Sequence, residues 1–453
     1  MLLYNQDELV NNVPGNNLIN SLPKRKQGLA GRLSYAYDGK YMAEVNMGYN
    51  GSENFAKGHR WGFFPSIALG YNISEESFFE PLRKVITSMK LRGSWGLVGN
   101  DQIGGERFIY MPTINLSGKG FTTGIDQNYG LSGPVYTRYE NNSITWEVGE
   151  KINLGIDLQL LNSLNIVVDI FRETRRDIFQ KKGTIPTYLG TGNTDVFGNL
   201  AEMKNQGLDL SIDYNKAFSK DFYMNFKGTF TYAHNEITKY DEAPKYAFQS
   251  KVGQSANVSQ GYLSNGLFLD EAEIDRYNQQ MGSTLGAGDI KYLNVSNMHG
   301  YGDDIVDVDD WTWIGNPTVP EIVYGFGPSF KYKNWDFSFF FQGVAKTSLF
   351  MSGFHPFGDN SLRNVLQFVA NDRWSPTNQN VDAKYPRLTR KTSLNNTNPG
   401  NSGRTSDYWM RDGSFLKLKN MELGYTFKRM RFYISGSNPV SYTHLRAHET
   451  TLH

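Results

Sequence analysis

Lys151-Ile-Asn-Leu-Gly-Ile-Asp-Leu-Gln-Leu160 is the clearest indication of how this chain folds, because apolar and polar residues alternate through all ten positions. The five even positions hold Ile or Leu, and the five odd positions hold Lys, Asn, Gly, Asp and Gln. Successive side chains of a β-strand point to opposite faces of a sheet. The stretch therefore predicts a strand with one apolar face and one polar face.

The same alternation recurs along the chain and predicts about twelve strands. They span residues 28–37, 40–51, 61–73, 88–98, 145–160, 164–179, 206–215, 221–233, 319–332, 335–345, 414–427 and 430–437. A tilted strand of about 9–11 residues is long enough to cross a membrane. We predict an all-β fold, an antiparallel transmembrane β-barrel, over the alternative of a soluble all-β protein, whose strands are usually shorter.

The predicted connections alternate between short and long. The short ones are 38–39, 162–163, 216–220, 333–334 and 428–429, and the long ones are 99–144, 180–205, 234–318 and 346–413. Short turns on one rim and long loops on the other are typical of outer-membrane barrels. Loops longer than about 12–15 residues are uncommon in compact domains and are usually functional.

The composition is compatible with a membrane barrel and excludes several other classes. The 453 residues carry 46 Lys+Arg against 45 Asp+Glu, so no basic excess indicates nucleic acid. Mean hydropathy is −0.51, as expected when a polar lumen lies behind an apolar outer face. Cysteine is absent, which removes disulfides and thiolate chemistry. Aromatic residues make up 14%, which fits strands and the aromatic girdles of barrels.

The two ends of the chain depart from the strand pattern. The N-terminus has no basic segment followed by an apolar one, so it is not a signal peptide and suggests a fragment. Residues 439–453 lack alternation and hold His444, His448 and His453. This segment resembles translated adapter or vector sequence. We expect residues 1–27 to be a loop or lead-in, 28–438 to be barrel, and 439–453 to be a non-native tail.

Eight segments resemble, in order, the SusC/RagA family of TonB-dependent outer-membrane transporters of Bacteroidota. They lie at 32–41, 61–79, 89–100, 144–157, 203–210, 288–292, 314–325 and 412–420. Among them are Met89-Lys-Leu-Arg-Gly-Ser-Trp-Gly-Leu-Val-Gly-Asn100 and Asp412-Gly-Ser-Phe-Leu-Lys-Leu-Lys-Asn420. No single motif is specific, whereas their shared order is.

The resemblance implies the later part of a barrel of about 22 strands, located in the cell outer membrane. It implies an upstream plug domain and an upstream segment that contacts TonB–ExbB–ExbD. It also implies a SusD-like surface lipoprotein as partner, and oligosaccharides or oligopeptides as cargo. The family ends in a further strand, whereas here the pattern stops at Asn438, so open strand edges are expected.

An Asp-rich segment is the one candidate for a metal site. It lies within Gly288 to Gly315, which corresponds to a family loop often written with a calcium-loop-like pattern. A Ca²⁺ loop needs oxygen ligands at alternating positions and a Gly for the turn. The candidate ligands are Asn294, Asp303, Asp304 and Asp307. Their spacing is stretched, so a solvated acidic loop without a cation is the favoured interpretation, and no cofactor is expected.

Trp311 and Trp313 follow this segment and are candidates for substrate binding. Aromatic faces stack on the apolar faces of sugar rings. The alternative is that both residues anchor the loop to the rim or to a partner. The row Trp335, Phe337, Phe339 and Phe341 is expected to face lipid, with Asp336, Ser338 and Gln342 opposite it.

The sequence carries no HExxH, GxSxG, P-loop or CxxC motif, so no enzymatic activity is expected. The first hypothesis is the barrel portion of a TonB-dependent importer. The second is a passive porin. The third is a soluble all-β adhesin or carbohydrate-binding protein.

Overall fold

The structure is a computed structural model that describes most of the chain. The described residues are 1–10, 21–103, 107–186, 188, 195–277, 279–280, 284–351, 357, 364–389, 395–396 and 405–443. The chain divides into two compact units, one built mainly from residues before 255 and one mainly from residues after it. Among the described residues, no helix has the length and apolar character needed to cross a membrane.

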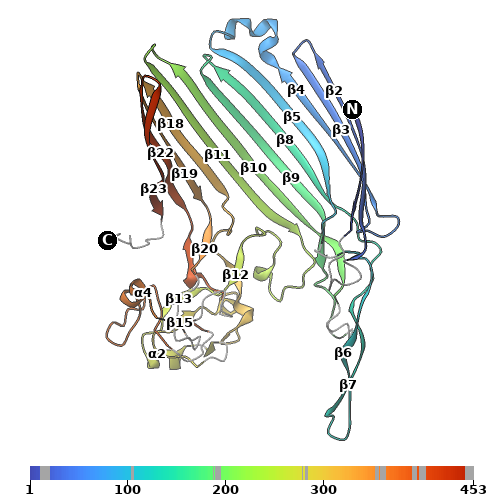
Figure 1. Ribbon diagram of the computed structural model, residues 1–453. Coiled ribbons are helices and arrows are strands. Elements are labelled where there is room, and N and C mark those ends of the chain that lie inside the picture. Colours follow the sequence, from blue (N-terminus) through green and yellow to red (C-terminus); the bar gives the residue numbers. More distant parts are fainter. Residues whose placement is uncertain are drawn as a thin grey trace. The chain divides into compact units, whose positions relative to one another are not determined.

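The first unit contains a run of nine antiparallel strands, here called the first sheet (Figure 1). Each strand pairs with the next in this order. The strands are β1 (Leu2–Leu9), β2 (Lys24–Tyr37), β3 (Tyr41–Ser52), β4 (Trp61–Asn72), β5 (Ile86–Asn100), β8 (Glu147–Leu160), β9 (Leu164–Lys181), β10 (Phe197–Ala217) and β11 (Phe222–Lys239).

The register of the first sheet collects the apolar residues on one face. Leu154 on β8 lies opposite Gly93 on β5 and opposite Ile170 on β9. Leu154 and Ile170 are 61% and 59% exposed, although both lie in the middle of the sheet. An apolar face that remains exposed in the isolated unit is expected where lipid replaces water as the solvent. We call this the apolar face and the opposite one the polar face.

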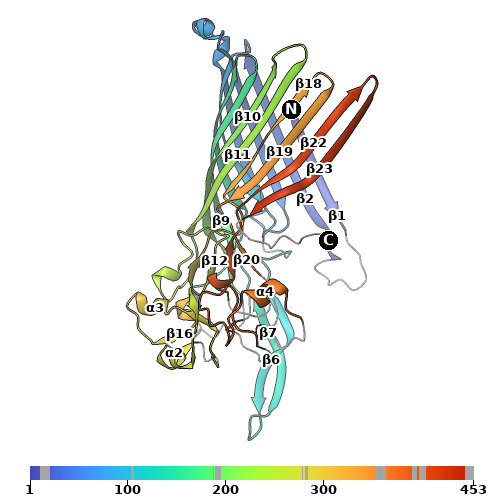
Figure 2. The same ribbon diagram turned by 90° about the vertical axis from the view of Figure 1, so that its left-hand side faces the viewer.

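The second unit contains four antiparallel strands, here called the second sheet. They are β18 (Ile322–Tyr332), β19 (Trp335–Ala345), β22 (Phe415–Phe427) and β23 (Met430–Thr443), paired in that order (Figure 2). The rings of Phe337, Phe339 and Phe341 contact one another at centroid distances of 5.4 and 5.7 Å, so they share a face as predicted. Asp336, which alternates with this row along β19, forms an ion pair with Arg431.

The tight turns follow from residues that tolerate positive φ. Asp38 and Gly39 have φ values of 52° and 64°, and the Lys40 amide donates to the Tyr37 carbonyl at 3.0 Å. Two central residues with positive φ make the turn whose twist matches that of paired strands. Leu161 and Asn162 repeat this arrangement between β8 and β9. The turn at the Asp38-Gly39 pair is therefore confirmed.

Long connections leave both sheets at the ends opposite the tight turns, as predicted from the alternation of loop lengths. In the first unit, the connection after β5 forms a hairpin of β6 (Thr113–Thr123) and β7 (Tyr129–Arg138), which projects beyond the strands (Figure 1). In the second unit, the long connections form a folded region of their own.

The two ends of the described chain differ from the expected domain boundaries. Within 1–27, expected to be loop, β1 forms a strand that pairs with β2, and β2 begins at Lys24. The segment Lys24-Arg-Lys-Gln27 is polar on both faces, so alternation gives no signal there. β23 continues past Asn438 to Thr443, across a register shift between Leu418 and Asn420. Residues 444–453 lie outside the described residues, and the non-native origin of the tail stays a prediction.

All twelve predicted strands are present, and each predicted span overlaps one observed strand. The fold class is all-β and antiparallel, as expected. Most differences between predicted and observed boundaries are strands that extend further at the end with the long loops. The largest example is β10, which begins at Phe197, nine residues before the predicted start at 206. The pairing there is irregular, with register shifts between Asn199 and Met203, so the period-two pattern is interrupted.

Candidate functional site

The long connections of the second unit fold into a region with its own core, here called the loop module (residues 255–321 and 346–414). Its core side chains come from segments far apart in sequence and are mostly aromatic or branched. They are Tyr262, Leu267, Ile290, Tyr292, Val306, Phe357, Val369, Trp374, Ala383, Tyr385 and Trp409. A buried aromatic core of this kind fixes a loop region in one conformation, which a binding surface requires.

The loop module is built from short elements that pair locally. The ladders are β12 (Ser259–Gly261) with β17 (Thr312–Ile314), β13 (Ser264–Leu267) with β15 (Ile290–Tyr292), β14 (Gln279–Gln280) with β16 (Ile305–Val306), and β20 (Ser348–Phe350) with β21 (Met410–Asp412). The helices are α2 (Glu271–Arg276), α3 (Val295–Met298) and α4 (Gln367–Asn371). β20 and β21 follow β19 and precede β22, so they join the loop module to the second sheet.

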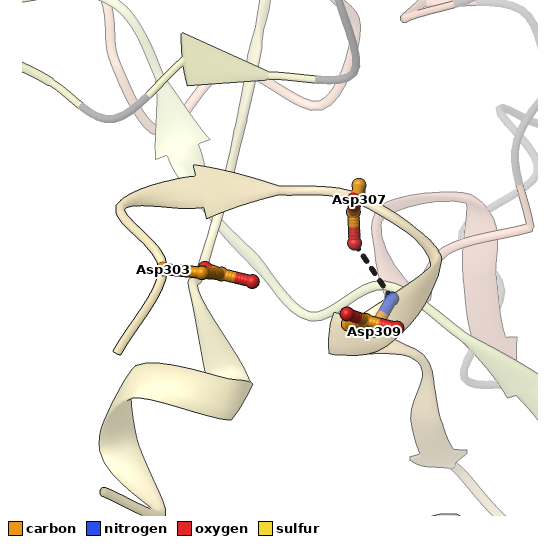
Figure 3. Close-up of side chains that lie close together, drawn as sticks. All are labelled: Asp303, Asp307 and Asp309. Atoms are coloured by element: carbon orange, nitrogen blue, oxygen red, sulfur yellow. Dashed lines mark hydrogen bonds between the residues drawn. The ribbon is translucent and has the colours of Figure 1, made fainter. Parts of the chain in front are cut away.

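The Asp-rich segment brings three carboxylates together (Figure 3). The closest oxygens of Asp303, Asp307 and Asp309 all lie within 4.8 Å of one another. Asp303 and Asp307 were candidates from the sequence, and Asp309 was not. Asp307 and Asp309 lie at the start of a 3₁₀ turn, η5 (Val308–Asp310), where the Asp307 carboxylate accepts from the Asp309 amide at 2.8 Å.

The two remaining candidate ligands have other positions. Asn294 begins α3, where its amide oxygen accepts from the Asn297 amide at 2.8 Å, and its NH₂ group donates to Asp303 at 3.2 Å. Asn294 therefore presents a donor to the cluster rather than an oxygen. Asp304 is exposed, has a φ of 54° and lies outside the three-carboxylate cluster.

A fourth carboxylate, Asp310, was not a candidate from the sequence and is fully buried. It accepts from the backbone amides of Ser296 at 2.9 Å and Asp307 at 2.8 Å, so it ties α3 to η5. Burial raises the pKa of Asp310 above its ordinary value. The charged segment thus contains one structural carboxylate inside and three more exposed ones outside.

The residues present do not fit a resident Ca²⁺ ion. Ca²⁺ takes about six to eight oxygen ligands, whereas this cluster offers three carboxylates that already accept other donors. Lys245 forms an ion pair with Asp309 and places a positive charge beside the cluster. The hydrogen bond to Asp309 raises the pKa of Lys245, so that charge is retained at neutral pH.

We therefore expect no stoichiometric binding of Ca²⁺ at concentrations on the order of 1 mM, at which weak extracellular modules bind. Isothermal titration of the chain with CaCl₂ checks this expectation, with MgCl₂ as the control for ionic strength. A saturable Ca²⁺ signal that Asp303→Asn abolishes would contradict it.

Trp311 and Trp313 are both partly buried in the loop module. The Trp311 ring packs against the core and meets the Tyr262 ring edge to face at a centroid distance of 5.9 Å. Trp313 lies in β17, and its indole N–H donates to the Ser250 carbonyl at 2.9 Å. These contacts favour the anchoring alternative, and binding of substrate by either residue stays a prediction.

Trp311→Ala is expected to destabilise the loop module by about 2 kcal/mol, less than the loss for a fully buried tryptophan. Trp313→Phe, which keeps an aromatic ring but loses the indole N–H and part of the ring, is the control and is expected to cost about 1 kcal/mol. Thermal unfolding followed by near-ultraviolet circular dichroism measures both. Unchanged stability with weakened ligand binding would instead assign Trp311 to the ligand.

A buried polar network joins two parts of the loop module that are distant in sequence, and no sequence motif paired its residues. Asp289 is fully buried and pairs with Arg387, whose Nη2 donates to Oδ2 at 3.0 Å. Asn396 and the Gly286 amide also donate to Asp289, at 2.6 and 2.9 Å. The hydrogen bond to Asp289 raises the pKa of Arg387. Asp289 and Arg387 are 98 residues apart, so a search for local sequence patterns cannot detect that they pair.

The polar face of the first sheet carries a second set of charges. Arg92 on β5 donates to Asp157 on β8 at 3.0 Å and to Asp169 on β9 at 2.9 Å. Gly155 on β8 lies next to the side chains of Arg92 and Asp169. A Cβ at this position would lie only 2.5 Å from an Asp169 oxygen, so a larger residue would not fit without displacing that carboxylate. Beside this triad is a hollow of about 550 Å³ whose lining includes Glu44, Lys90, Arg92, Ser94 and Asn153. This face can therefore line a water-filled passage.

Comparisons with known proteins agree with this architecture. The family model described as TonB-dependent receptor-like β-barrel matches residues 3–438. TonB-dependent receptor SusC of Bacteroides thetaiotaomicron is 28% identical over 415 residues, covering 88% of this chain and 38% of SusC. TonB-dependent receptor P3 of Formosa agariphila is 26% identical over 437 residues, covering 91% of this chain and 40% of that protein.

Among solved structures, the RagAB peptide transporter matches with a TM-score of 0.66 at 18% identity, covering 93% of this chain and 44% of that one. At this identity the match shows the fold alone. The chain spans about two fifths of the length of the curated relatives that it matches.

Proposed function

We propose a function for this chain on the basis that it belongs to the TonB-dependent receptor-like β-barrel family. In this proposal, the chain supplies wall strands and extracellular loops to an outer-membrane nutrient importer. The observation that carries the proposal is the two-sided first sheet. Its apolar face is exposed, with Leu154 61% accessible, whereas its polar face carries the Arg92, Asp157 and Asp169 triad. A wall between lipid and a polar passage needs both faces.

In this proposal the chain binds and gates but makes or breaks no covalent bond. The loop module contributes to capture at the outer surface, because its aromatic core holds a long connection in one shape. A plug domain in the parent protein closes the passage until TonB–ExbB–ExbD energises its movement. Relatives of this chain are named receptors and transporters rather than enzymes, which supports the absence of catalysis.

The finer parts of the proposal concern cargo and partner. We assign oligosaccharides or oligopeptides as the cargo class and a SusD-like lipoprotein as the partner that covers the outer mouth. Similarity to SusC and to a chain in a structure titled as a peptide transporter supports this assignment. The names of these two relatives describe those proteins, and the particular cargo of this chain does not follow from them.

A passive porin is the second candidate, because the same two-sided wall would serve passive diffusion. The two differ in energy coupling, so uptake of cargo by the importer stops when TonB is removed and uptake through a porin does not. The soluble adhesin is disfavoured by the exposed apolar face, since large exposed apolar patches on soluble monomers are rare.

The first experiment is recovery of the intact genomic locus across both ends of this reading frame. We expect a signal peptide, plug and TonB-contact segment upstream, with a gene for a SusD-like lipoprotein beside it. Deletion of the gene should then abolish growth on one glycan or peptide source, and deletion of tonB should do the same. A true start at Met1 without such neighbours, or growth unaffected by loss of tonB, would reject the importer.

A further inference from the structure

One connection at the tight-turn end of the first sheet is longer than the others and carries exposed apolar side chains. It joins β4 to β5 through two 3₁₀ turns, η1 (Ile73–Glu75) and η2 (Ser77–Leu82). We call residues 73–85 the rim insert. It sits beyond the strand ends, beside the β8–β9 turn (Figure 1).

The rim insert is tied to the end of the apolar face through Tyr41. Tyr41 belongs to the apolar face, because it alternates with Glu44 and Asn46 along β3 and stacks on Tyr71 at 5.1 Å. Its hydroxyl donates to Glu76 of the insert at 2.7 Å. Lys40 reaches the same carboxylate at 3.5 Å. These contacts hold the insert next to a tyrosine pair at the edge of the apolar face.

The insert is amphipathic in spite of its short turns. Phe79 is 3% exposed, whereas its neighbour Phe78 is 67% exposed. Leu82, Val85 and Leu161 are also more than half exposed, and the Leu161 amide donates to the Val85 carbonyl at 2.9 Å. We call Phe78, Leu82, Val85 and Leu161 the rim patch.

Charge in the insert is largely paired within the unit. Arg83 lies 3.9 Å from Glu75 and donates to the Ser74 carbonyl at 2.8 Å, while Glu76 is held by Lys40 and Tyr41. The insert holds three acidic residues (Glu75, Glu76 and Glu80) against two basic ones (Arg83 and Lys84), so it has no basic excess that would direct it to an anionic surface. What it offers a partner is apolar area beside aromatic hydroxyl groups.

We propose that the rim patch inserts into the lipid bilayer at the tight-turn end of the sheet and packs at the boundary between headgroups and acyl chains. The proposal rests on the proposed membrane function. Its occupant is the bilayer because the rim insert is bound to the Tyr41–Tyr71 pair at the end of the apolar face, and tyrosines mark membrane interfaces. Apolar side chains on a short amphipathic segment bind this interface by burial.

The absence of cysteine from the chain makes the test direct, because each introduced cysteine takes the only spin label. Phe78→Cys and Leu82→Cys report on the patch. Glu80→Cys, an exposed polar position on the same insert, is the matched control. Leu154→Cys reports on the apolar face, and Ile125→Cys, fully exposed beside β6, reports on water. The full chain is reconstituted in phosphatidylcholine vesicles with and without phosphatidylglycerol.

Power saturation compares collisions of each label with oxygen, which partitions into lipid, and with a polar nickel chelate, which stays in water. We expect Phe78→Cys and Leu82→Cys to resemble Leu154→Cys, with oxygen collisions dominant, and Glu80→Cys to resemble Ile125→Cys. Phosphatidylglycerol is expected to change neither result.

The outcomes separate this proposal from the proposed function. If Leu154→Cys is exposed to lipid and both patch labels are exposed to the chelate, the rim patch lies in water and the inference is overturned. Shielding of the patch from both reagents would also overturn it, since a protein surface or second copy would then cover the patch. Exposure of Leu154→Cys to the chelate would instead reject the membrane location of the sheet.

Discussion

Replacing Arg387 with alanine is expected to destabilise the loop module by about 3–5 kcal/mol, the usual cost of leaving a buried charge without its partner. Asp289 is fully buried and depends on Arg387 for its only charged hydrogen-bond donor among the described residues. Asn396 and the Gly286 amide remain, but neither carries charge. The loss should appear as local opening of β15, which begins one residue after Asp289.

Hydrogen exchange followed by mass spectrometry measures this opening in peptides that cover Ile290–Tyr292. Lys384→Ala is the matched control, because Lys384 pairs with Asp372 at 3.3 Å but is 61% exposed, and exposed pairs contribute little. Protection of β15 that is equal in the Arg387 and Lys384 variants would show that the buried pair does not hold the module together.

A charge placed on the apolar face should be the second large effect. Leu154→Arg is expected to cost about 2–4 kcal/mol, the value for a basic residue facing lipid near the middle of the membrane. Leu154 lies midway along β8 and opposite Gly93 and Ile170. Asn153→Arg places the same charge one residue earlier, on the polar face, and is expected to cost less than about 1 kcal/mol.

Guanidinium unfolding in lipid vesicles, followed by tryptophan fluorescence, compares the two variants at equal lipid content. The two arginines differ only in the face that they occupy, so secondary-structure propensity cancels. Equal destabilisation by both would contradict the assignment of lipid and passage to opposite faces. A larger loss for Asn153→Arg would reverse that assignment.

The strands were predictable because their signal is local. A residue alternates with its immediate neighbours, so the faces of β8 can be read from ten consecutive letters. The resemblance to the SusC/RagA family is likewise confirmed, by the family model and the curated relatives. β1 was missed because its eight residues, together with the polar start of β2, alternate poorly.

The candidate site was predicted only in part. Of the four candidate ligands, Asp303 and Asp307 lie together although the spacing of the candidates is stretched, and the third carboxylate is Asp309, which was not a candidate. A one-residue change of direction at Asp304, which has positive φ, removes its side chain from the group. Trp311 and Trp313 are placed by packing and by one hydrogen bond to Ser250, neither of which alternation can show.

The strands, their two faces and the alternation of short turns with long connections follow from the amino-acid sequence alone. Each of these depends on interactions between neighbours or on a periodic pattern. Which side chains meet in the loop module depends instead on tertiary packing. Asp289 and Arg387 are 98 residues apart, and the pair forms because the aromatic core closes the loops between them. Loop closure is a property of the whole packed module, so no local pattern records it.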